Sequence, residues 1–117
     1  MNKRTVGSLK EQQAAAFLVQ NEFLILETNF RCRLGELDLI AQKDDQIHFV
    51  EVKYRKNTAY GYPAEAVDYR KQSKICKVSD YYRLTHPSLN ECGCHFDVIA
   101  ILGDELIFYL DAFEYRF

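Results

Sequence analysis

The sequence predicts an α/β fold in which helices flank a central mixed sheet. Five short segments, rich in apolar residues and bounded by turn residues, have the pattern of strands. Two other segments, one before the first strand and one between the third and fourth, repeat apolar residues at helical spacing. The resulting order, α-β-β-β-α-β-β, is typical of a mixed sheet. With 117 residues, 48% of them hydrophobic, the chain is expected to form a single domain, residues 1–117.

The first element is predicted to be a helix that runs from Ser8 to about Asn21. Ser8 and Glu11 have the spacing of a capping box, in which each side chain bonds the backbone N–H of the other residue. A first strand is expected from Phe23 toward Arg33, followed by a turn at Leu34 and Gly35.

Two strands, at about 36–42 and 46–54, are predicted to form a hairpin around a tight turn at Asp44 and Asp45. With that turn, the position numbers of paired residues sum to 89. Asp38 then lies opposite Glu51 on the same face of the sheet, whereas a slip of one residue would put the two acids on opposite faces.

The second half of the chain supplies a loop, a helix and a second hairpin. Residues 55–63 combine basic and aromatic residues with glycine and proline, which is typical of a loop. An amphipathic helix is predicted from Ala64 to about Arg83, and a polar loop over residues 86–93. Strands at 96–102 and 106–110 are joined by a turn at Gly103 and Asp104.

Composition narrows the class of protein. The net charge of −2 argues against a strongly basic nucleic-acid coat, but residues 31–77 hold ten Lys and Arg against seven acids. No apolar run approaches the ~20 residues that span a bilayer, and the N-terminus does not resemble a secretory signal. We therefore expect a cytoplasmic protein with no membrane association. Its four cysteines are expected to be reduced thiols, because Cys92-Gly93-Cys94-His95 does not have the usual zinc spacing.

The opposed acids predict a cation site. Two carboxylates at facing positions repel each other, which favours a cation between them, and Mg²⁺ is usually held by one or two carboxylates plus waters. Asp38 and Glu51 are the candidate ligands, with the carbonyl oxygen of Val52 as a further one, and Lys53 is on the same face to act on a water or a phosphate. The alternative is a surface charge ladder in which Glu36 pairs with Lys53.

Further candidates surround this cluster in the sequence. Glu11 either completes its capping box or faces the site as a further metal ligand. Lys71 and Gln72, on the second helix, either lie on a solvated face or reach a phosphate or the metal-bound water. Three arginines could contact phosphates, and three tyrosines could stack on unpaired bases: Arg31, Arg33, Arg55, Tyr54, Tyr60 and Tyr62. Asp97 is expected to be a hydrogen-bonded structural acid.

Several motifs together resemble those of the YraN-type bacterial family. The match covers nearly the whole chain, in the family's order, and departs from it at Tyr54 and His95, where members often carry threonine and arginine. The motifs are Asn29-Phe30-Arg31-Cys32-Arg33-Leu34-Gly35-Glu36-Leu37-Asp38-Leu39-Ile40, Phe49-Val50-Glu51-Val52-Lys53-Tyr54-Arg55, Ala66-Val67-Asp68 with Lys71, Phe96-Asp97-Val98-Ile99-Ala100-Ile101, and Ala112-Phe113. That family is similar to the archaeal Holliday junction resolvases, within the PD-(D/E)xK nuclease superfamily.

The resemblance implies a restriction-endonuclease-like αβββαβ core with a central mixed sheet flanked by helices. It implies that Asp38, Glu51 and Lys53 are the catalytic residues, that Asp38, Glu51 and Glu11 bind Mg²⁺ or Mn²⁺, and that DNA, more than RNA, is the partner. The expected activity is that of a DNA endonuclease acting on branched or single-stranded DNA in repair or recombination. Two alternatives stay open: a non-catalytic nucleic-acid-binding module and a protein-interaction subunit. A homodimer is compatible with each.

Overall fold

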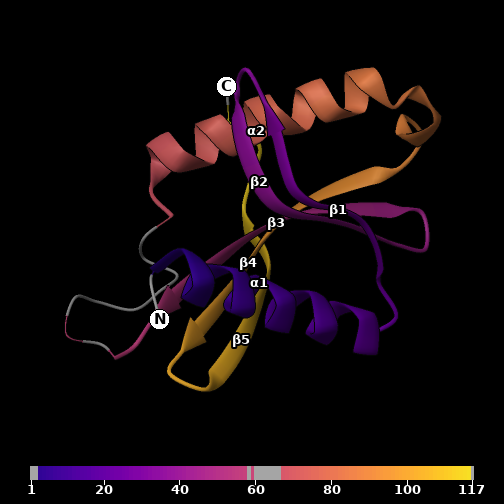
Figure 1. Ribbon diagram of the computed structural model, residues 1–117. Helices are drawn as coiled ribbons and strands as arrows, with labels where there is room; N and C mark the ends of the chain where they lie inside the picture. The colour runs from indigo at the N-terminus through magenta and orange to yellow at the C-terminus, as the bar shows by residue number, and fades with distance from the viewer. Residues whose placement is uncertain (1–2, 58, 60–66, 117) are drawn as a thin grey trace.

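A sheet of five strands separates two long helices (Figure 1). The structure is a computed structural model that describes residues 3–57, 59 and 67–116. The mixed α/β fold predicted from the sequence is confirmed. The elements, in chain order, are α1 (Lys3–Gln20), β1 (Leu24–Cys32), β2 (Gly35–Lys43), β3 (Gln46–Arg55), α2 (Tyr69–Thr85), the short 3-10 helix η2 (Pro87–Leu89), β4 (Gly93–Leu102) and β5 (Glu105–Phe113).

The strands lie in the order in which they occur in the sequence, β1-β2-β3-β4-β5. Neighbouring strands pair antiparallel except for β3 and β4, which run parallel. The parallel pair requires a crossover, and the segment containing α2 provides it. The sheet is therefore mixed because one helix connects two hairpin-like units.

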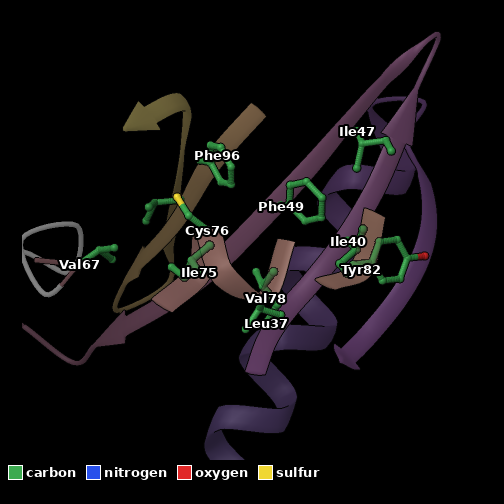
Figure 2. Close-up of a cluster of buried hydrophobic side chains, with 11 residues drawn as sticks. Leu37, Ile40, Ile47, Phe49, Val67, Ile75, Cys76, Val78, Tyr82 and Phe96 are labelled. Atoms are coloured by element: carbon green, nitrogen blue, oxygen red, sulfur yellow. The ribbon is translucent and has the colours of Figure 1, made fainter. Parts of the chain in front are cut away.

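Each face of the sheet carries its own hydrophobic core. Along β3, Ile47 and Phe49 pack on the α2 side, whereas Val50 packs on the α1 side. This alternation follows from the two-residue period of a strand. Figure 2 shows the core on the α2 side, where Ile75 and Val78 from the helix meet Phe49 from the centre of the sheet. Because β3 is covered on both faces, a polar side chain in its middle is buried.

The predicted register of the β2–β3 hairpin is confirmed, but the two strands part sooner than expected. Pairs run from Lys43–Gln46 to Leu39–Val50, and every pair of numbers sums to 89. Beyond Leu39 the alternation of β2 breaks, because Leu37 belongs to the core on the α2 side and Leu39 to the core on the α1 side. Residues two apart in a regular strand share a face, so β2 rotates about its axis at Asp38.

The adjacent strand has an unusual backbone conformation at the same level. Asn29 has a φ of +52° and lies between Thr28 and Phe30, which pair with the residues on either side of Asp38. Asparagine tolerates this left-handed conformation better than most residues. The β1–β2 ribbon is therefore bent at Asn29 and Asp38, and β2 is directed away from β3.

Two predicted helix starts are wrong. Helix α1 begins at Lys3, so Ser8 lies inside the helix and the capping box does not form. No proline separates Lys3 from Ser8, and Gly7 lowers helix propensity by only about 1 kcal/mol, so nothing stops the helix before Ser8. Helix α2 begins at Tyr69 rather than Ala64, because Asp68 is extended and its carboxylate accepts the N–H of Lys71. Residues 64–66 lie outside the described part.

The cap of α2 gives a first test of the fold. Replacing Asp68 by alanine removes the acceptor for the Lys71 N–H, and we expect the free energy of unfolding to fall by about 1 kcal/mol. Urea unfolding followed by circular dichroism measures this change. Asp68→Ser keeps a capping oxygen and should retain most of the stability, whereas equal losses in both variants would contradict the capping role.

Candidate functional site

The acids predicted to form the site meet where β2 separates from β3. At this point the carboxylate of Asp38 accepts the backbone N–H of Val52, with 2.8 Å between Oδ2 and N. A side chain thus replaces the next bond of the strand ladder and holds Asp38 beside Glu51. The prediction had Asp38 paired across the ladder with Glu51, but the last recorded backbone pair is Leu39–Val50.

Glu51 is a buried carboxylate with an incomplete set of partners. Its residue is 3% exposed, and Oε2 has no hydrogen-bond partner among the described residues. Lys71 Nζ lies 3.1 Å from that oxygen and forms an ion pair with it. A buried ionised carboxylate is costly unless further partners satisfy its remaining lone pairs.

The surroundings raise the pKa of Glu51 to about 8. Burial is the largest cause, followed by a hydrogen bond with Asp38 and by the charge of Asp38. Lys71 and Lys53 act in the opposite direction and offset part of this effect. Two carboxyl groups can share a hydrogen bond only when one of them is protonated, so Asp38 and Glu51 share a proton at neutral pH. A cation could replace that proton between the two groups.

Helix α1 adds a third acid from the other side of the sheet. Burial and the charge of Asp38 raise the pKa of Glu11, while a hydrogen bond with Asn29 lowers it. A hollow of about 170 Å³, lined by both Glu11 and Asn29, opens beside this side chain. Since α1 begins well before Ser8, Glu11 is released from the predicted capping box and is available to the site.

Two lysines complete the cluster. Lys53 is two residues beyond Glu51 on β3 and therefore on the same face, as expected from the sequence. Lys71 lies in the first turn of α2, where its ion pair with Glu51 places it beside the acids, and its contact with a phosphate or a metal-bound water stays a prediction. Burial is the largest single effect and acts to lower the pKa of Lys71, but its interactions with Glu51 and the charges of Asp38 and Glu36 together outweigh burial, and the pKa is raised.

The chemistry of this donor set fits a divalent cation. Glu51 contributes a buried oxygen without a hydrogen-bond partner, and Asp38 places a second carboxylate in contact with it. Mg²⁺ is commonly held by one or two carboxylates with waters completing its shell. Among the described residues, no three acidic, histidine or cysteine side chains are close enough to enclose an ion by themselves. Binding of Mg²⁺ or Mn²⁺ at these two carboxylates stays a prediction, and it would need waters or a phosphate to complete the shell.

The remaining predicted residues are not part of this cluster. Arg31 pairs with Glu36 across the β1–β2 hairpin at 3.2 Å, so Glu36 has a different partner from the predicted Lys53. Arg33 is exposed in the turn of that hairpin, and Arg55 bonds the carbonyl oxygen of Tyr54 at the end of β3. The prediction that these three arginines contact phosphates is untested.

Gln72 is buried and uses its amide for the fold. Its nitrogen donates to the carbonyl oxygen of Val67, and its oxygen accepts a bond from Arg116 at 2.7 Å. Tyr54 lies under the ammonium of Lys10, while Tyr60 and Tyr62 lie outside the described residues. A direct role for Gln72 with nucleic acid stays a prediction, and the structure assigns its amide to anchoring the start of α2.

One residue of the site was not singled out from the sequence. Asn29 contacts Glu11 and has left-handed backbone opposite Asp38. The only signal was the tolerance of asparagine for this conformation, which is too common to identify a site. Asp97, by contrast, is fully buried and accepts bonds from His48 and from the backbone of Asp111, which confirms the structural role expected for it.

The acids do not line the most extensive of the hollows described for this protein, among which one is larger than the hollow beside Glu11. That hollow, of about 620 Å³, lies between the second half of α2 and the strands β4 and β5, with Arg83, Phe96 and Tyr115 in its lining. The site is better recognised by its buried, interacting charges than by its concavity.

Comparison with known proteins identifies the family. A model described as "Uncharacterised protein family UPF0102" matches residues 10–101, which include every site residue named above. The chain belongs to the UPF0102 family. This confirms the YraN-type family expected from the sequence motifs.

Several relatives called UPF0102 protein match over most of their length. The relative from Lachnoclostridium phytofermentans is 40% identical over 114 residues, 97% of each chain. That from Acetivibrio thermocellus is 48% identical over 110 residues, 90% of this chain and 84% of its own. That from Syntrophus aciditrophicus is 45% identical over 117 residues, 97% of this chain and 91% of its own. None of the helices described here is long and apolar enough to cross a membrane.

Proposed function

We propose that this member of the UPF0102 family is a divalent-metal-dependent nuclease that hydrolyses phosphodiester bonds in DNA, with branched or single-stranded DNA as the preferred substrate. The observation that carries the proposal is the buried Glu51 carboxylate, which has an oxygen without a hydrogen-bond partner and touches a second carboxylate. A structural acid at this position would be matched by donors, whereas a metal ligand requires a cation. The order of elements and the mixed sheet are compatible with a restriction-endonuclease-like core.

In this proposal Asp38 and Glu51 would hold Mg²⁺ or Mn²⁺, and Glu11, which does not close a three-acid cage with them, would be a further ligand through a bound water. The bound ion would lower the pKa of a water and offset negative charge on the scissile phosphate. Lys53, on the same face as Glu51, orients or deprotonates that water or stabilises charge on the phosphate. Lys71 would balance the charge of Glu51.

One observation favours a second candidate, a nucleic-acid-binding module without catalysis. Lys71 already lies 3.1 Å from Glu51, so a protein cation stands where a metal ion is proposed. If Lys71 stays in place, the two acids serve the architecture and the fold provides only a binding surface. The two candidates agree on nucleic acid as the partner and differ in whether the acids act on it.

The deciding experiment is cleavage of a panel of single-stranded, duplex, flap, four-way-junction and RNA substrates in Mg²⁺ and in Mn²⁺. We expect metal-dependent cutting by the wild type that disappears in Glu51→Gln. Glu36→Gln is the matched control, because it removes an exposed acid from the neighbouring strand and should cut normally.

Equal cutting by the wild type and Glu51→Gln would indicate a contaminating nuclease and contradict the proposal. Salt-sensitive DNA binding without cutting would support the non-catalytic module. Absence of both would refute a nucleic-acid function and favour the protein-interaction subunit.

A further inference from the structure

A second pocket lies at the other end of the central strands, on the α1 side of the sheet. It has a volume of about 360 Å³ and is lined by Phe17 from α1, Phe23, and Phe108 from β5. His48, near the start of β3, is three residues before Glu51, or about 10 Å along the strand. The pocket shares no residue with the acidic cluster, and the nuclease proposal does not use it.

The histidine in this pocket is held in one orientation. His48 Nδ1 lies 2.6 Å from Asp97 Oδ2, and the other oxygen of Asp97 accepts the backbone N–H of Asp111 at 2.8 Å. Since the carboxylate accepts, Nδ1 of the neutral ring carries the proton and Nε2 is left as an acceptor. Among the described residues Nε2 has no recorded hydrogen-bond partner, and His48 is part of the pocket lining. The pocket therefore presents a fixed acceptor.

A second histidine reinforces this arrangement. The ring of His95 stacks on that of His48 with centroids 4.4 Å apart and planes 9° apart. His95 bonds Asp111 Oδ1 at 2.6 Å and Gln46 Oε1 at 2.7 Å. Asp111 itself is held in a left-handed conformation, with a φ of +52°. Aspartate tolerates this conformation, and the two bonds of His95 hold its ring in place against that of His48.

The polar groups of the pocket include both donors and acceptors. The side-chain amide of Gln46 bonds Nε2 of His95, which leaves the rest of that amide for a ligand. The amide nitrogen of Asn21 donates to the carbonyl oxygen of Phe17, which leaves the Asn21 oxygen as an acceptor. Lys43 and Asp44 add one cation and one anion to the lining, so the pocket favours neither charge.

We propose that this pocket binds a nucleobase. The three phenylalanines give it apolar, aromatic walls that suit a flat ring, and its volume is at the small end of the usual range for ligand pockets. The edge of a base offers both donors and acceptors, so its N–H groups can meet the acceptors of His48 and Asn21 while the Gln46 amide pairs with a neighbouring position. An aliphatic ligand would leave these groups unpaired, and a simple anion would meet the acceptors and Asp44. The base belongs either to a free nucleotide or to an unpaired position in a strand.

Calorimetric titration with the four deoxynucleoside monophosphates, and with deoxyribose 5-phosphate as the baseless probe, tests the assignment. We expect saturable binding of at least one nucleotide and none of the sugar phosphate. His48→Asn should weaken binding about tenfold, because the asparagine amide can still donate to Asp97 while the Nε2 acceptor is lost. His86→Asn, at the end of α2, is the matched control and should bind normally.

Two further arms complete the test. Phe108→Leu keeps an apolar side chain at a partly exposed position but removes the ring, and it should also weaken nucleotide binding. This variant tests the pocket even if His48→Asn does not fold. A single-stranded oligonucleotide compared with its abasic counterpart shows whether a base within a strand is the ligand.

Binding that is unchanged in Glu51→Gln separates this pocket from the nuclease site. Equal binding of the sugar phosphate, or no dependence on a base in any arm, would overturn the proposal.

Discussion

The stability of the metal-free protein should fall as the pH rises from about 4.5 to about 8, and Glu51→Gln should remove most of this fall. Burial and the neighbouring Asp38 carboxyl raise the pKa of Glu51 to about 8 from its ordinary value of 4.5. Between these values the folded protein keeps a proton that the unfolded chain releases, so raising the pH favours unfolding. Below about pH 4.5 both states are protonated and Glu51 contributes no dependence.

The size of the effect follows from the shift. Each pKa unit corresponds to about 1.4 kcal/mol, so the loss is at most about 5 kcal/mol, and on the order of 3 kcal/mol once neighbouring groups adjust. Urea unfolding at pH 5, 6, 7 and 8 measures it as the difference between wild type and Glu51→Gln. Taking the difference cancels the titration of groups common to both, including Glu11, whose raised pKa acts in the same direction.

Two controls make the result specific to the buried pair. Glu36→Gln removes an exposed carboxylate and should keep the slope of the wild type. Added Mg²⁺ should stabilise the wild type more at pH 8 than at pH 5, because it replaces the proton between Asp38 and Glu51. If the stability of the wild type and of Glu51→Gln changes with pH in parallel, then the pKa of Glu51 is not raised and this prediction is wrong.

The part of the fold that the sequence predicted best is the β2–β3 hairpin. Alternating residues on both sides of Asp44 and Asp45 allow only one register that keeps the apolar side chains buried, and the structure has that register. Helix ends were harder to predict. Ser8 and Glu11 match a capping box locally, but a helix continues through such a pair when nothing before it stops the chain.

The composition of the site was predictable, whereas its geometry was not. Register alone put Asp38 near Glu51, but the sequence does not show that β2 rotates at Asp38 and leaves the ladder. That rotation depends on the left-handed conformation of Asn29 and on a bond from Asp38 to the backbone of Val52. The local sequence permits several conformations at both places, and tertiary contacts determine which one the chain adopts. Lys71 is a similar case, because helical periodicity alone left it on either a solvated face or the site.

The sharpest test of the site is Asp38→Asn, which should abolish catalysis without harming the fold. An asparagine oxygen can still accept the Val52 N–H, so the strand geometry is kept. Removing one of two interacting carboxylates also removes a cause of the raised pKa of Glu51, so stability at pH 8 should be equal or greater. The proposed metal loses a charged ligand, and we expect the rate of metal-dependent cleavage to fall about 10³-fold.

The matched control is Asp97→Asn, because Asp97 also accepts a backbone N–H from a neighbouring strand. Asp97 faces His48 rather than a second acid, so its replacement disturbs a buried hydrogen bond and should cost about 2 kcal/mol of stability while the folded fraction keeps its activity. Both aspartates accept a backbone N–H. Loss of activity alone in Asp38→Asn and loss of stability alone in Asp97→Asn would therefore show that Asp38 is catalytic and Asp97 is structural. If Asp38→Asn is destabilised as much as Asp97→Asn, then Asp38 is an architectural residue and the acids support only the binding module.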